Sequence, residues 1–349
     1  MTDVFILGAG FSIAVASPMP SAMELGRRVI DQQKSIHAAA PRVHSSVCDG
    51  LSCDDPVLPP QFPNLDFEHW LSKLAEPQPY LFVPQNLQRR AMFEKLSGLV
   101  AMQIDGAVHS AISGQPNPPP WLVNLISAWN QRRATVVSFN YDTIIEATVD
   151  HMRLRTVAGD PVHHQNLAPM PFPMWAATYD GPPSHADSLT LIKLHGSTNW
   201  YWDDVSRSAD SVVQVGLRSR WGEQSPVFVS GRDRAHGKVP FIAPPTSGKS
   251  EYSSNSLLRD LWRRAYEALV GARRVFVIGY SLPVTDQLVR SLLEDSLAPE
   301  TELWVINPDL GVVQNFEALR SGKIVTTHCG GSPGTRLAAE FVDHYVSTP

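Results

Sequence analysis

Two short glycine-containing turns are the first parts of this sequence that could do chemistry. One is Gly8-Ala9-Gly10-Phe11-Ser12, and the other is Gly279-Tyr280-Ser281. Glycine lets backbone N–H groups approach a phosphate that side chains would otherwise exclude, so both turns could line a pyrophosphate. A tight turn without a ligand is the alternative. A dinucleotide fingerprint needs a third glycine where this chain has Ile13, and a helix directly after the turn, where Pro18 and Pro20 intervene.

Amide, carboxylate and imidazole side chains follow three other apolar runs. Asn140 and Asp142 come after one run, and His195 with its following glycine comes after another. Asn307 and Asp309 follow a third, where an amide and a carboxylate could hold a ribose diol. Structural alternatives exist, because Asn and Asp commonly cap a helix that begins just after them, and a lone histidine at a strand end is more often structural than catalytic.

Six β-branched or aromatic runs must position these side chains, and each is typical of a buried strand. They are residues 4–7, 135–139, 189–194, 274–278, 302–306 and 323–327. Several are followed at once by a small-residue turn and then a helical pattern, as in a doubly wound α/β fold. The sequence therefore predicts a Rossmann-like parallel sheet of about six strands with helices on both faces, and candidate residues at the carboxyl ends of the strands.

The long segment between the first two strands is predicted to be helical rather than β. One helix begins after Pro20, with Ser21 and Glu24 at the spacing of a capping box. We predict a single domain over residues 1–349, with a mainly helical insertion at about 22–130. An irregular loop at about 161–183 is predicted to be either a packed surface loop or a mobile lid.

Composition excludes several classes of protein. The 349 residues are 43% apolar and 18% charged, which favours a globular chain over a disordered one. A formal net charge of −5 gives no general field for nucleic acid. The three cysteines offer no CxxC pair and no even disulfide framework, so we expect no metal and a reducing, cytoplasmic location. We expect neither a signal peptide nor a membrane span.

Taken together, the motifs stand in a recognisable order along the chain. They are GAGFS, FNYD, LHG, GYSL and INPD, at residues 8–12, 139–142, 194–196, 279–282 and 306–309. In this order they resemble the motif series of the sirtuins. The FNYD and GYSLPxxD wording, with the helical segment at 66–68, resembles more closely the sirtuin-like NAD hydrolases of bacterial antiphage defence. The resemblance spans residue 4 to about residue 310.

One departure from the sirtuins bears on function. Sirtuin deacylases carry a four-cysteine zinc module after the HG motif, whereas this chain has no cysteine between Cys53 and Cys329. The resemblance therefore implies a domain without the zinc module, in which deacylation is in doubt while NAD consumption is retained. No metal is expected, and NAD is expected as the substrate.

The resemblance also implies a role for each motif residue. The pyrophosphate would be lined by Gly8, Ala9, Gly10, Phe11 and Ser12, with Gly279 and Ser281 on its other side and Asn307 and Asp309 at the adenosine ribose. The nicotinamide ribose would be surrounded by Asn140, Asp142 and His195.

These three residue types suit cleavage of the nicotinamide–ribose bond. Nicotinamide departs as a neutral molecule, so no general acid is required. Asp142 would stabilise the ribose cation, and Asn140 would orient a ribose hydroxyl or the attacking water. His195 would deprotonate that hydroxyl or water. The expected products are nicotinamide and ADP-ribose.

An enzyme that depletes NAD must be restrained in its host. We expect a homo-oligomer, a separate regulatory partner such as an ATPase or helicase or an Argonaute-like protein, or both, and no direct contact with membrane or nucleic acid. The alternatives are an NAD-dependent protein deacylase, an ADP-ribosyltransferase, and a sensor or scaffold that binds NAD or ADP-ribose without turnover. The sequence alone does not separate hydrolysis from ADP-ribose transfer.

Overall fold

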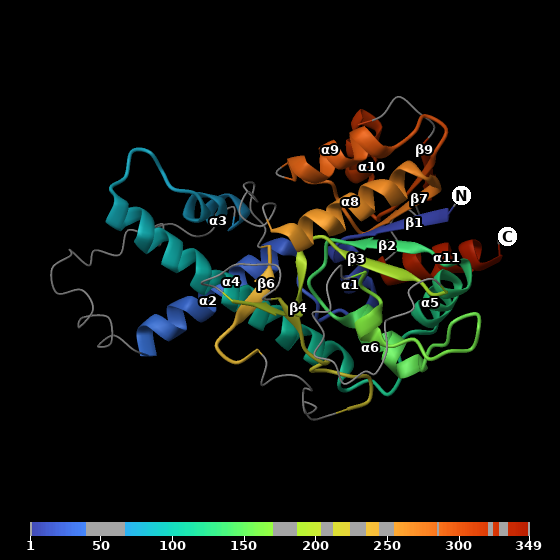
Figure 1. Cartoon of the computed structure of the whole chain (residues 1–349), viewed down its shortest axis with the longest axis horizontal. Helices are drawn as coiled ribbons and strands as arrows, with labels where there is room; N and C mark the ends of the chain where they lie inside the picture. Colours follow the sequence, from blue (N-terminus) through green and yellow to red (C-terminus); the bar gives the residue numbers. More distant parts are fainter. Residues whose placement is uncertain are drawn as a thin grey trace.

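A six-stranded parallel sheet organises the chain (Figure 1). The computed structural model describes residues 2–39, 67–169, 187–203, 212–223, 235–243, 255–284, 286–319, 324–327 and 334–347. In the order β3-β2-β1-β7-β8-β9, the strands are β3 (Thr190–Lys193), β2 (Thr135–Ser138), β1 (Thr2–Leu7), β7 (Ala272–Ile278), β8 (Glu302–Ile306) and β9 (Ile324–Thr327). Neighbouring strands all pair in parallel. These are the six predicted runs, so the predicted Rossmann-like sheet is confirmed.

Helices cover both faces of this sheet, because successive side chains of a strand point to opposite sides. Phe5 and Leu7 of β1 belong to a core that includes α1 (Ala9–Val15), α5 (Pro120–Arg132) and α11 (Gly334–Ser347). Val4 and Ile6 belong to a second core, under α8 (Ser256–Val270), α9 (Gln287–Ser296) and α10 (Leu310–Leu319). Figure 1 shows the two helical layers above and below the strands. With both faces buried, β1 is apolar throughout its inner part.

Helices also fill the described chain between β1 and β2. After α1 they are α2 (Ala22–Ala39), α3 (Phe67–Ala75), α4 (Val83–Ile112) and α5. The Ser21 hydroxyl accepts the Glu24 N–H at 3.3 Å, as a capping box requires. The helix α6 (Ile144–Met152) follows β2. Of the predicted irregular loop, residues 161–169 contain the turn η1 (His164–Asn166), and residues 170–183 lie outside the described residues.

The structure corrects one expectation drawn from the sequence and contains one sheet that the sequence did not predict. The helix α1 begins directly after Gly8, and Pro18 and Pro20 lie beyond its end, so the expectation that these prolines interrupt the first turn was wrong. A three-stranded antiparallel sheet was not predicted. It comprises β5 (Val213–Gln214), β4 (Gly196–Trp202) and β6 (Val239–Ile242). Nearly every side chain of β4 is buried, so the alternation that marks a half-exposed strand is missing from its sequence.

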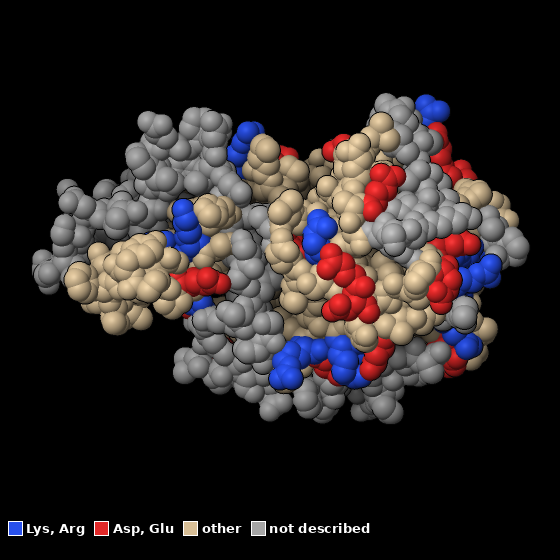
Figure 2. Space-filling view, turned by 90° about the horizontal axis from the view of Figure 1, so that it is seen from above, with Lys and Arg blue, Asp and Glu red and all other residues tan. Residues whose placement is uncertain are grey.

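Charged side chains are interspersed on the surface drawn in Figure 2. Lys and Arg lie there in small separate groups among Asp and Glu. No helix among the described residues is long and apolar enough to cross a membrane.

Candidate active site

The two glycine turns pack directly against each other at the carboxyl ends of β1 and β7. The Gly10 N–H donates to the Gly279 carbonyl at 2.9 Å, and the Gly8 N–H donates to the Ile278 carbonyl at 3.1 Å. Gly279 has φ +64°, and a Cβ there would lie 2.2 Å from the Phe11 nitrogen. A Cβ on Gly10 would lie 2.8 Å from the Gly279 Cα. Backbone packing alone therefore requires glycine at both turns, whether or not a phosphate binds.

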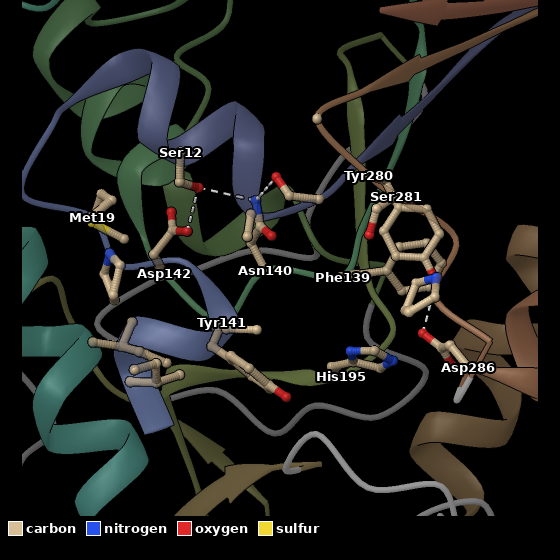
Figure 3. Close-up of a pocket in the computed structure, with 18 residues that line it drawn as sticks. Ser12, Met19, Phe139, Asn140, Tyr141, Asp142, His195, Tyr280, Ser281 and Asp286 are labelled. Carbon is tan, nitrogen blue, oxygen red and sulfur yellow. Dashed lines mark hydrogen bonds between the residues drawn. The ribbon is translucent and has the colours of Figure 1, made fainter. Parts of the chain in front are cut away.

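A cavity of about 200 Å³ opens beside these turns. Of the residues predicted for the site, Gly8, Ala9, Ser12, Asn140, Asp142, His195, Gly279 and Ser281 line it (Figure 3). Met19, Leu25 and Ile104, from the segments around α2 and α4, add an apolar wall. Residues more than 100 positions apart in the sequence therefore meet at the carboxyl ends of the strands.

Ser12 links two of the candidate catalytic side chains. The Asn140 Nδ2 donates to the Ser12 Oγ at 3.0 Å and to the Gly8 carbonyl at 2.8 Å. The Ser12 hydroxyl in turn donates to the Asp142 Oδ2 at 2.6 Å. Ser12 is only 3% exposed, so its hydroxyl serves this chain of hydrogen bonds from Asn140 to Asp142. The amide oxygen of Asn140 makes no hydrogen bond within the described part of the chain, and it is the polar atom that remains for a ligand.

Asp142 combines the two roles that its sequence position allows. Its Oδ1 accepts the N–H of Ile144, the first residue of α6, at 3.1 Å. Its Oδ2 accepts the Ser12 hydroxyl, and the residue is 8% exposed at the cavity wall. Because both oxygens have a donor, the carboxylate is held in one orientation. It caps the turn before α6 and faces the cavity at the same time.

His195 lies in the connection between β3 and β4. The next residue, Gly196, has φ +79°, and a Cβ there would lie 2.1 Å from the Phe241 carbonyl oxygen, so the glycine of this motif is required by the backbone. The imidazole is 6% exposed, and its centroid lies 5.1 Å from that of Phe139 and 6.1 Å from that of Tyr141. Figure 3 shows it across the cavity from Asn140 and Asp142.

Tyr280 and Asp286 line the cavity with polar groups but were not among the predicted site residues. Tyr280 stacks on Phe139 at 4.6 Å between ring centroids, and its hydroxyl donates to the Asp286 Oδ2 at 2.7 Å. The GYSLPxxD motif could have indicated both residues, because its tyrosine and its carboxylate are six residues apart in one turn.

Four predicted residues do not line the cavity. Gly10 is used in the packing of the turns, and Phe11 is 1% exposed in the core, edge-on to Trp121 at 5.9 Å between centroids. The Asn307 Oδ1 accepts the Asp309 N–H at 3.0 Å, and the Asp309 Oδ1 accepts the Gly311 N–H at 2.8 Å at the start of α10. Contact of these residues with NAD stays a prediction.

No group of three or more His, Cys, Asp or Glu side chains that could hold a metal occurs in the described ranges. The three cysteines lie outside those ranges. The polar side chains of the cavity are one amide, two carboxylates, hydroxyls and one imidazole, which suit hydrogen bonding and stabilisation of positive charge.

Comparison with known proteins gives a result for structure only. No family model matches the chain, and no curated protein matches it in sequence. Solved structures to which it is similar include Sir2 homologues. One, a complex with NAD, shares 14% identity at a TM-score of 0.46, over 99% of this chain and 91% of that one. A Sir2 homologue variant in complex with ADP-ribose shares 14% identity at a TM-score of 0.44, over 98% of this chain and 91% of that one.

Proposed function

We propose that this chain is an NAD glycohydrolase, which cleaves the nicotinamide–ribose bond to give nicotinamide and ADP-ribose. One observation carries the proposal. Asn140, Asp142 and His195 come from the ends of two neighbouring strands and meet at one cavity, next to two turns whose glycines allow close approach. This arrangement supports binding of a ribose at the three side chains and of the adjoining phosphates at the turns.

The geometry of Asp142 suits stabilisation of a ribose cation. As the bond between nicotinamide and C1′ breaks, its electron pair stays with the nicotinamide nitrogen, and positive charge develops on the ribose. A buried, oriented carboxylate stabilises such charge more than one in water, because it needs no reorganisation during the reaction. The donors from Ser12 and Ile144 hold Asp142 in that orientation.

Asn140 and His195 then act on the nucleophile. The Asn140 amide oxygen can accept a hydrogen bond from a ribose hydroxyl or from water. The oxygen of a water adds to C1′, and its proton passes to the imidazole of His195 on the opposite side of the cavity. The apolar wall of Met19, Leu25 and Ile104 limits access to bulk water, so the positioned water is the one that reacts.

The test is nicotinamide and ADP-ribose release from NAD by the purified protein, with His195→Ala and Asn140→Ala measured beside it. We expect release by the wild type and a loss of about 10²- to 10⁴-fold in His195→Ala, the range for a general base. Circular dichroism should show that both variants still fold, and calorimetry should show that both still bind NAD. Full turnover in His195→Ala would remove that residue from the mechanism.

The same assay separates the alternatives. Release that requires an acyl-lysine peptide would identify a deacylase, and ADP-ribose attached to protein would identify a transferase. Binding without release would identify a sensor or scaffold.

We further propose that the enzyme depletes NAD in the cytoplasm as an effector of antiphage defence, restrained by a homo-oligomer or by a separate partner. Large apolar side chains are exposed near the start of α4, among them Tyr80, Phe82, Val83 and Leu87. Such a patch is typical of a protein–protein contact. Light scattering of the wild type and of Phe82→Asp/Val83→Asp should show a smaller particle for the variant. Identical particle masses would place any contact elsewhere.

A further inference from the structure

Lys193 is a buried cation that neither the motifs nor the proposed mechanism uses. It ends β3, two residues before His195, and its side chain is only 2% exposed. A buried charge costs free energy unless it is paired and hydrogen-bonded, and a well-packed apolar pair is often as stable. A lysine at this position therefore calls for an explanation from what its ammonium group contacts.

The ammonium group contacts the loop that carries Asp142. The Lys193 Nζ donates to the Asp142 carbonyl at 2.5 Å and lies 3.4 Å from the Tyr141 carbonyl. It also donates to the Ser197 hydroxyl at 2.7 Å, and that hydroxyl lies 3.3 Å from the same Tyr141 carbonyl. The ammonium thus joins the end of β3 and the start of β4 to the loop that follows β2.

Glu146 compensates the charge. Its Oε1 lies 3.0 Å from the Lys193 Nζ, and its side chain is 4% exposed in the first turn of α6. The pair therefore adds no net charge behind the cavity. Its consequence is geometric, because it fixes the helix after Asp142 against the strand before His195.

We infer that Lys193 is a positioning residue for NAD cleavage: through its bonds to the Asp142 and Tyr141 carbonyls it sets the distance between the Asp142 carboxylate and the His195 imidazole. The inference rests on the proposed function. Catalysis is sensitive to this distance, since a displacement of about 1 Å can cost about 10²-fold in rate. Substrate binding depends more on the two glycine turns, which Lys193 does not touch.

The test compares two charge-free pairs. Lys193→Met/Glu146→Met removes both buried charges, so no unpaired ion remains and the melting temperature should stay within a few degrees of the wild type. We expect its kcat for nicotinamide release to fall about 100-fold while KM for NAD changes less than threefold. The matched control, Arg336→Met/Glu340→Met, removes an exposed pair on α11 and should leave kcat unchanged.

A gentler variant keeps the test decisive if the double variant does not fold. Ser197→Ala deletes one hydroxyl that bridges Lys193 and the Tyr141 carbonyl. We expect a three- to tenfold loss of kcat with KM unchanged. Wild-type kcat in Ser197→Ala, or in a folded Lys193→Met/Glu146→Met, would overturn the inference.

If the proposed function is wrong, the wild-type protein itself will release no nicotinamide from NAD, and this outcome is distinct from a loss of kcat in the variants. In that case the geometric part of the inference, that Lys193 sets the position of His195 relative to Asp142, is decided by the imidazole NMR signals of His195, assigned by their loss in His195→Asn. A shift of these signals in Ser197→Ala supports the positioning role, and unchanged signals overturn it.

Discussion

The two halves of the sheet use their carboxyl ends differently. At β2 and β3, the polar side chains Asn140, Asp142 and His195 all line the cavity. At β8, Asn307 and Asp309 accept backbone N–H groups at the start of α10, and neither lines the cavity. The same residue types at equivalent strand ends thus serve a candidate site on one side and a helix terminus on the other. What distinguishes them is where their hydrogen bonds go.

Among the carboxylate substitutions, the largest expected effect is on Asp142, and it tests whether the β2–β3 side carries the chemistry. Asp142→Asn keeps an oxygen for the Ile144 N–H, and the Ser12 hydroxyl can rotate to accept from the new amide, so the fold should be retained. The negative charge is lost, and we expect kcat for nicotinamide release to fall about 10²- to 10³-fold.

The same substitution across the cavity provides the control for Asp142. Asp286→Asn changes a carboxylate whose Oδ2 accepts from Tyr280, and it should lower kcat less than tenfold. Equal losses in the two variants would mean that the β2–β3 side has no special share in catalysis.

The next effect in size is on stability and concerns the point where the two halves meet. Gly279→Ala places a methyl group 2.2 Å from the Phe11 nitrogen at φ +64°, so we expect the free energy of unfolding to fall by more than about 2 kcal/mol. Gly98→Ala is the matched control. A Cβ there meets nothing within 4 Å on α4, and alanine in a helix interior gains about 0.5–1 kcal/mol. Urea unfolding should show a lower free energy of unfolding than the wild type for Gly279→Ala and a higher one for Gly98→Ala.

The sequence was sufficient for the elements that depend on local pattern. All six strands of the main sheet were predicted, because each is an apolar run bounded by turn residues. Their parallel pairing followed from the alternation with helices. The second sheet was missed, since β4 is buried on both faces and its partner β5 has only two residues, too few to give a strand pattern.

Within the candidate site, the sequence indicated which residues lie at strand ends but not which of them face the cavity. Asn140 and Asn307 both follow apolar runs, yet only the first lines the cavity. The difference depends on tertiary contacts. The Asn140 Nδ2 donates to the Gly8 carbonyl, 132 residues away, whereas the Asn307 Oδ1 accepts the N–H of Asp309, two residues along the chain. The role of Ser12 as a link to Asp142, rather than as a phosphate contact alone, is likewise set by packing.

A smaller effect tests the β8 side directly. Asp309→Ala removes the oxygen that accepts the Gly311 N–H at the start of α10, and loss of such a cap costs about 1 kcal/mol. Asp309→Asn keeps an acceptor and should keep most of that stability. We expect KM for NAD within threefold of the wild type in both variants. A tenfold rise in KM would return Asp309 to the ribose contact that the sequence predicts, and would remove the contrast between the two halves.

The smallest expected effect concerns a second, partly buried carboxylate near the β2–β3 side, and it asks whether burial alone marks a functional acid. Asp105 follows Ile104 on α4 and lines a separate cavity of about 620 Å³. Burial raises the pKa of Asp105 above its ordinary value. The positive charge of Arg218, whose Nη1 lies 3.2 Å from the Asp105 Oδ2, opposes this shift. A carboxyl whose pKa is higher in the folded state stabilises the fold fully below its unfolded pKa of about 3.9, and that contribution is lost as pH rises through the folded pKa. Asp105→Asn cannot ionise, so relative to the wild type it should gain stability between pH 4 and pH 7, by less than the capping effect above.

The pKa of Asp150 is shifted in the opposite direction, so Asp150 serves as the control for Asp105. His164, whose Nδ1 lies 3.4 Å from the Asp150 Oδ1, and Arg220 lower the pKa of Asp150. Its contribution to stability is therefore present above its unfolded pKa and lost as pH falls through the folded one, so Asp150→Asn should lose stability at pH 7 and match the wild type at low pH. Thermal unfolding at several pH values, with nicotinamide release at pH 7, checks both variants. Wild-type kcat in Asp105→Asn, beside the loss in Asp142→Asn, would show that the chemistry depends on the placement of a carboxylate at the strand end and not on its burial.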